Sequence, residues 1–231
     1  SVLTQRSARG DLEKNVVDQL RYATLPPLPE TKDEVLALAK VLNADTTTDI
    51  FLGKEATRES VLKASENNSL SERQIIVFAT HGLLPGDLPK LEQPALAMSA
   101  VAEGAGSPLL TLEDVMGLRL NADWVVLSAC NTASGDGNAE AVSGLGRAFF
   151  YAGAKALLVS NWPVDTVASR QLMIDLFKKQ SSSEKITKPE SLRQAMLTLA
   201  DSGGVRDPKT NTLSYSYAHP LFWAPFVVVG D

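Results

Sequence analysis

Two apolar stretches, IIVFATHG at residues 75–82 and WVVLSACNT at residues 124–132, decide the fold. Each is a short run of β-branched, aromatic and other apolar residues closed by a turn signal. Such runs are typical of strands that are buried on both faces of a parallel sheet. The carboxyl ends of parallel strands meet at one edge of the sheet, where ligand crevices form. His81 and Cys130 follow the two runs, so the sequence predicts that they meet at this edge.

The remaining chain alternates between strand and helix signals, which predicts a doubly wound α/β fold with helices on both faces of a mostly parallel sheet. Asp165 is a plausible N-cap for one helix, and a capping-box pattern at 31–34 begins another. Gly153 is a good left-handed stop for a third. The further predicted strands are 50–52, 95–98, 155–160 and 222–229, and the predicted helices are 32–43, 58–67, 112–117, 139–152, 166–179 and 190–201.

Domain organisation follows from the proline-rich stretch LPPLP at residues 25–29, which interrupts regular structure because each proline fixes φ and removes a donor. Residues 1–25 carry scattered apolar positions at near-helical spacing, which indicates a connecting helical arm or the remnant of an upstream segment. Residues 26–231 form the compact domain. Residues 83–108 are dense in glycine and proline, and such a long insertion after a strand predicts a lid over the crevice.

Composition excludes several classes of function. The chain has 231 residues with 22 basic and 27 acidic side chains, a net charge of −5 without a basic stripe, so nucleic acid is not an expected partner. No apolar stretch approaches the roughly 18 residues of a membrane span, and the first residues lack the layout of a signal peptide. One cysteine permits no intrachain disulfide and favours a reducing, cytoplasmic location. The first residue is Ser, which suggests an excised fragment of a longer chain.

The pair formed by His81 and Cys130 suits cysteine peptidase chemistry. A free cysteine with a pKa near 8.5 is only about 3% thiolate at neutral pH, and a neighbouring imidazole raises that fraction. The thiolate attacks the peptide carbonyl, and the histidine gives a proton to the departing amine. The N–H groups of Gly82 and Cys130 are candidates for the oxyanion hole, because a glycine without Cβ lets its N–H approach the substrate closely. No metal or other cofactor is expected.

Four ordered blocks carry a family resemblance: FATHG at 78–82, LSACNT at 127–132, AFFYAGAKALLVSNWPVD at 148–165 and HPLFWAPFVVVGD at 219–231. They resemble the CHAT domain, a caspase-like, clan CD peptidase domain that often follows tetratricopeptide repeats in bacterial proteins and is related to separase. The resemblance implies a three-layer α/β/α sandwich with His81 and Cys130 as the catalytic dyad. The separation of the two residues agrees with the roughly 50 positions, histidine first, described for caspases. SACNT differs from the QACRG type of true caspases, so aspartate specificity is not implied.

The resemblance also suggests a substrate and a mode of regulation. Related peptidases that cut after Arg or Lys use a carboxylate near the strand ends, for which Asp165 is the first candidate and Asp136 the second. The alternative role of Asp165 is a helix N-cap, and that of Asp136 is a turn residue beside glycines. The family arrangement implies gating by upstream tetratricopeptide repeats or by a regulatory protein partner, with a protein or peptide as substrate.

Other interpretations stay open from the sequence. A lone cysteine at a strand end is often a small buried hydrophobe, and a lone histidine is often structural. His219 precedes Pro220 and an aromatic strand, which favours a role in a turn or in packing. A metal site built from His81, Cys130 and His219 is disfavoured because paired ligand spacings are absent. The alternative function is a catalytically idle CHAT-like interaction module in a signalling protein.

Overall fold

The computed structural model describes residues 22, 25–100, 107–128, 139–162, 165–182, 186–207 and 209–230. Its α-helices are α2 (Glu30–Leu42), α3 (Arg58–Glu66), α4 (Leu112–Met116), α5 (Ala139–Ala152), α6 (Thr166–Ser182) and α7 (Lys188–Asp201), and its 3₁₀ helices are η1 (Gly53–Glu55) and η2 (Pro220–Phe222). Its strands are β1 (Ile75–Phe78), β2 (Gly82–Leu83), β3 (Ala95–Ala97), β4 (Leu109–Thr111), β5 (Trp124–Leu127), β6 (Ala156–Ser160), β7 (Gly204–Arg206), β8 (Leu213–Ser216) and β9 (Phe226–Gly230). None of the helices in this described part combines the length and apolar character that a membrane span requires.

The central sheet has the strand order β1-β5-β6-β9. The first three strands are parallel, and β9 is antiparallel to β6 at the edge. The two decisive runs of the sequence therefore form neighbouring strands, β1 and β5, as predicted. Their register pairs Ile75 with Trp124 and Phe78 with Leu127.

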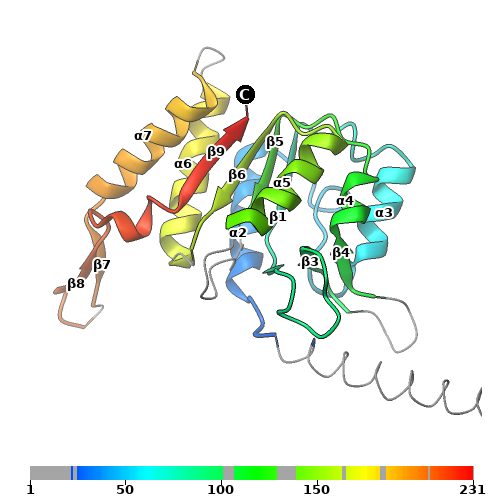
Figure 1. Ribbon diagram of the computed structural model, residues 1–231. Coiled ribbons are helices and arrows are strands. Elements are labelled where there is room, and N and C mark those ends of the chain that lie inside the picture. Colours follow the sequence, from blue (N-terminus) through cyan, green and yellow to red (C-terminus); the bar gives the residue numbers. More distant parts are fainter. Residues whose placement is uncertain are drawn as a thin grey trace, which may run out of the picture.

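Helices cover both faces of this sheet (Figure 1). Successive residues of a strand point to opposite faces, so the buried strands feed two separate cores. One core packs strand residues such as Phe78 and Leu127 against Phe149 of α5. The other packs Val126 and Leu158 against α2, α6 and α7. Burying each such side chain stabilises the fold by roughly 1.5–3 kcal/mol, and the predicted α/β class with a mostly parallel sheet is confirmed.

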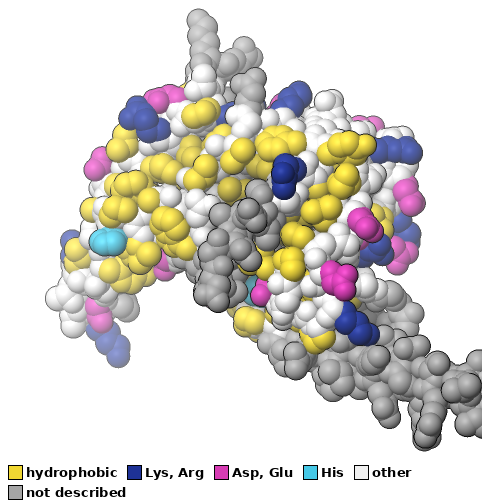
Figure 2. Space-filling view, in the orientation of Figure 1, with side chains coloured by type: hydrophobic (Ala, Val, Ile, Leu, Met, Phe, Trp, Pro, Cys, Tyr) yellow, Lys and Arg dark blue, Asp and Glu magenta, His cyan; other side chains and the backbone are white. Residues whose placement is uncertain are grey.

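The edge strand β9 leaves apolar side chains exposed. Phe226 is buried, but Val227 and Val229 are 37% and 44% exposed. Figure 2 shows hydrophobic side chains gathered on the face of the molecule that carries β9 and α5. Tyr151, near the end of α5, is 76% exposed.

The stretch at 83–108 is not the irregular lid that its glycine and proline content predicted. In its described part, β2, β3 and β4 form an antiparallel sheet of their own. Leu83, Leu88 and Leu91 are buried in a third apolar cluster. The strand predicted at 95–98 is confirmed as β3, but β2 and β4 were not predicted, because they are only two and three residues long and show little periodicity. Residues 101–106 lie outside the described part.

Other local predictions need correction. Residues 50–52 form no strand, and Phe51 is 49% exposed because no neighbouring strand pairs with it. The strand expected at 222–229 begins only at Phe226, after η2. The strands β7 and β8 form a small hairpin that sequence patterning did not reveal.

The predicted capping box at 31–34 is also wrong. Helix α2 begins earlier, at Glu30, and its N-cap Pro29 makes no side-chain cap. The hydroxyl of Thr31 instead donates to the carbonyl of Leu28 at 2.7 Å. Glu34 is therefore free of any capping role, and its side chain is turned into the protein interior.

The end of α5 gives a test of the packing. Gly153 has φ +112°, and a Cβ there would lie 2.2 Å from the carbonyl oxygen of Leu120. Gly86 has φ +93° with no atom within 4 Å of such a Cβ. Gly86→Ala should cost only backbone strain, roughly 1–3 kcal/mol, whereas Gly153→Ala should cost clearly more. Urea unfolding followed by circular dichroism measures both, and equal losses would contradict the close approach to Leu120.

Candidate active site

His81 lies just beyond the carboxyl end of β1, where the sequence predicts it. The segment is fixed to β3 by two hydrogen bonds. The hydroxyl of Thr80 donates to the carbonyl of Ala97, and the N–H of Ala97 donates to the carbonyl of His81 at 2.9 Å. The imidazole is half-buried, and its backbone cannot drift away from the sheet edge.

The orientation of the ring is set by a backbone carbonyl that the sequence analysis missed. Nε2 of His81 lies 2.8 Å from the carbonyl oxygen of Pro26. A carbonyl only accepts hydrogen bonds, so Nε2 carries the hydrogen and Nδ1 of the neutral ring is left as the proton acceptor. The tautomer of His81 is thus assigned from its partner.

Pro26 is itself held by its neighbours. Leu25 and Tyr22 pack against the apolar cluster of the small sheet. The hydroxyl of Tyr22 donates to the carbonyl of Met98, and burial raises the pKa of this phenol to about 12. The chain that precedes α2 is therefore fastened beside the small sheet, with the Pro26 carbonyl directed at His81.

Gly82 opens β2 directly after His81 and is buried. His81 and Ala97 form a hydrogen-bonded pair across β2 and β3, and Gly82 is paired with Leu96 in the next position. Hydrogen-bonded and non-hydrogen-bonded pairs alternate in antiparallel ladders, so the N–H of Gly82 points away from β3. The strand pairing with β3 therefore does not use this N–H.

Cys130 and Asp136 lie outside the described residues, which end at Ser128 and resume at residue 139. The strand that leads to Cys130 is well defined. Paired residues of β1 and β5 differ by 49 positions, as Ile75 and Trp124 do, and His81 and Cys130 differ by the same 49. The N–H of Ser128 still donates to Phe78 of β1 at 3.1 Å, so the pairing continues past the last assigned residue of β5.

Glu34 reaches this strand from α2, a feature that the sequence analysis missed. The carboxyl is only 3% exposed, and its Oε1 accepts a hydrogen bond from the hydroxyl of Ser128. Burial raises the pKa of Glu34, while the Ser128 hydrogen bond and the charge of Arg170 on α6 act in the opposite direction. A buried carboxyl is thus hydrogen-bonded to the residue two positions before the predicted nucleophile.

Asp165 serves as the helix cap that was one of its two predicted roles. Its Oδ1 accepts the N–H of Ala168 at 2.9 Å, at the start of α6. Its Oδ2 accepts the hydroxyl of Tyr215 from β8 at 3.2 Å. Burial and the nearby Asp165 charge raise the pKa of Tyr215, and the same causes raise that of Tyr217 to about 12. Asp165 and His81 follow parallel strands at the same sheet edge, with β5 between those strands.

His219 has the turn role that was predicted for it. It precedes η2, and its Nδ1 accepts the N–H of Leu221 at 3.1 Å. Within the described residues, no group of three or more His, Cys, Asp or Glu side chains is placed to hold a metal ion.

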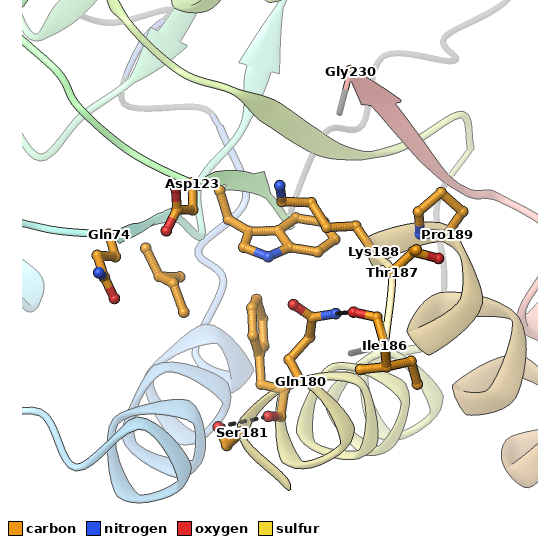
Figure 3. A pocket seen from close by; sticks show the side chains of 12 residues that line it. Gln74, Asp123, Gln180, Ser181, Ile186, Thr187, Lys188, Pro189 and Gly230 are labelled. Atoms are coloured by element: carbon orange, nitrogen blue, oxygen red, sulfur yellow. Dashed lines mark hydrogen bonds between the residues drawn. The ribbon is translucent and has the colours of Figure 1, made fainter. Parts of the chain in front are cut away.

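A large groove reaches the candidate site. It has a volume of about 1290 Å³ and runs along β1 between α2 and α3, with Pro26, Thr80 and His81 at one end. A smaller pocket of about 460 Å³ lies around Trp124 (Figure 3). Its lining includes Gln74 and Asp123, which immediately precede β1 and β5. This smaller pocket therefore lies at the opposite ends of the strands from His81.

Comparison with known proteins agrees with this architecture. The family model of the CHAT domain matches residues 4–231. Tetratricopeptide repeat protein 28 of Mus musculus is 27% identical over 234 residues, which cover 89% of this chain and 9% of the relative. Tetratricopeptide repeat protein 28 of Homo sapiens is 26% identical over 236 residues, which cover 89% of this chain and 8% of the relative. The chain spans less than a tenth of the length of these curated relatives.

The buried carboxyl of Glu34 predicts a pH effect on stability. Because the folded state holds the Glu34 proton more tightly than the unfolded chain does, ionising the group costs folding free energy. The wild-type protein should therefore lose free energy of unfolding, relative to Glu34→Gln, as the pH rises above the ordinary value of 4.5. Urea unfolding at several pH values measures the difference.

The matched control for this experiment is Glu30→Gln, an exposed carboxylate on the same helix. A Glu34→Gln difference that does not change with pH would contradict the raised pKa.

Proposed function

Because the chain belongs to the CHAT domain family, we propose that it is a caspase-like cysteine peptidase domain that hydrolyses peptide bonds through His81 and Cys130. The observation that carries the proposal is the register of β1 and β5. Adjacent strands lie about 4.8 Å apart, and paired residues of β1 and β5 share the offset of 49 positions that separates His81 from Cys130, which supports a placement of the two residues at the same sheet edge. The caspase-like α/β/α sandwich is part of the same proposal.

The chemistry uses the hydrogen-bond pattern around His81. Nδ1, left free by the Pro26 carbonyl at Nε2, takes the proton of the Cys130 thiol. The thiolate forms a bond to the carbonyl carbon of the substrate, and the N–H groups of Gly82 and Cys130 stabilise the oxyanion. His81 returns the proton to the departing amine as the C–N bond breaks. Water, deprotonated by the same imidazole, then cleaves the thioester and restores the thiol.

The preference for substrates is assigned to a carboxylate near the strand ends. Asp165 is the first candidate and Asp136 the second, for a substrate with Arg or Lys at the cleavage position. The Asp165 carboxylate lies near the sheet edge, and both its oxygens already accept hydrogen bonds. Each carboxylate oxygen has more than one lone pair, so capping and recognition of a cation are compatible.

We assign regulation to an upstream repeat domain or to a protein partner. The relatives are named for tetratricopeptide repeats, which supports an upstream repeat domain or a protein partner as the gate. Residues 1–25 are proposed to form the connecting arm to it, and residues 26–231 the peptidase domain. The physiological substrate is a protein or peptide.

A second candidate function is an interaction module in which the dyad is idle. The observation that favours it is the exposed apolar surface around β9, with Val227, Val229 and Tyr151. Exposed apolar groups that lie together are typical of protein interaction sites.

The first test is hydrolysis of peptide libraries by point variants. Cys130→Ala should abolish cleavage because it removes the nucleophile, and His81→Ala should slow it roughly 10²- to 10⁴-fold because it removes the acid and base. The rates are measured as the fluorescence released when the full domain, joined to its upstream segment, cleaves the labelled peptides. Unchanged cleavage in either variant excludes the mechanism, and absence of cleavage in the wild-type protein with an intact fold supports the interaction module.

The second test concerns the basic pocket. An acyloxymethyl ketone with Arg or Lys at the cleavage position should label Cys130, as detected by mass spectrometry. Asp165→Asn should lose the preference for a basic over a neutral probe, while its amide oxygen still caps α6. Labelling by the basic probe at the wild-type rate would remove Asp165 from the pocket and leave Asp136 as the candidate.

A further inference from the structure

The hydrogen bond between Glu34 and Ser128 joins helix α2 to the residue that follows β5. Among the described residues, no other polar contact joins these two segments. Ser128 directly follows β5, on the last stretch before Cys130. Its N–H is held by Phe78 of β1, and its hydroxyl is held by Glu34 of α2. Ser128 is thus held by one hydrogen bond within the sheet and by a second from helix α2, which covers the sheet.

We propose that Glu34 is a positioning residue, which fixes through the Ser128 hydroxyl the point at which the chain leaves β5 towards Cys130. This inference rests on the proposed peptidase function. A hydrogen bond at the backbone N–H alone leaves Ser128 free to rotate about its N–Cα bond, the φ angle. A second anchor on the side chain fixes Cβ and therefore the direction in which the Cα–C bond leaves Ser128, and a nucleophile needs such restriction for productive geometry.

Packing alone does not explain a carboxyl at position 34. The surrounding core contains Leu38, Val126 and Leu158, and an apolar side chain would be accommodated there without the cost of burying a carboxyl. The charged group that faces Glu34 from another element is Arg170 of α6. A carboxyl is retained where it lowers stability, and among the described residues the side chain hydrogen-bonded to it is Ser128.

The single cysteine of the chain makes a direct test possible. The rate of alkylation by iodoacetamide, measured against pH in the full domain, reports the thiolate fraction of Cys130 and no other group. Ser128→Ala and Glu34→Leu should slow alkylation at pH 7 by about tenfold, as the thiolate fraction falls towards the roughly 3% of a free cysteine. Ser128→Thr, which keeps the hydroxyl, and Glu34→Gln, which keeps an acceptor, should restore most of the rate.

Thermal unfolding of the same variants separates positioning from stability. Glu34→Leu should unfold at or above the wild-type temperature and still react slowly, an outcome that a purely structural role does not produce. The matched control is Ser65→Ala, which removes another buried serine hydroxyl, one that accepts the N–H of Arg119 at 2.9 Å. It should lose stability without changing the pH profile of alkylation.

The His81→Ala variant distinguishes failure of the positioning role from failure of the proposed dyad. If His81→Ala changes the pH profile and the Ser128 and Glu34 variants do not, the positioning role is wrong and the dyad stands. If the wild-type thiol titrates near 8.5 and none of the variants changes its profile, both the dyad and the positioning role are overturned.

Discussion

The parallel pairing of β1 with β5 is the constraint on which the rest of the structure depends. Both strands are buried by helices on two faces, so their side chains must alternate between two different cores. A slip of one residue would exchange those faces, moving Phe78 into the core that now holds Val77. The burial pattern therefore fixes the register, and the register in turn fixes which residues of the two following segments are level at the sheet edge.

The stretch from Pro26 to Glu34 connects this edge to the start of the domain. Its first residue accepts the hydrogen bond of His81, and its last accepts that of Ser128. The two contacts lie eight positions apart, one on each side of the start of α2. A displacement of α2 would therefore act on the ends of β1 and β5 together.

The fold was predictable where burial left a strong pattern. Runs such as Ile75–Phe78 and Trp124–Leu127 are apolar on both faces, which is the signal of a buried strand. The apolar triplet at 50–52 gives a similar signal but has no neighbour with which to pair. Strands such as β2 depend on tertiary partners rather than on periodicity. The sequence predicted His81 by its place at a strand end, but a partner that is a backbone carbonyl, as at Pro26, has no side-chain signature.

Glu34 is a second feature that the sequence pattern did not predict. On an amphipathic helix a glutamate is usually an exposed residue. Together with Thr31, three positions earlier, Glu34 matched the pattern of a capping box. The helix starts at Glu30, so Glu34 is not in a capping position, and its buried carboxyl accepts the hydrogen bond of Ser128. Burial there is tolerated because Ser128 donates to it and Arg170 offsets part of its charge. Glu34 is thus identified as unusual by the cost of its burial, which a sequence pattern does not contain.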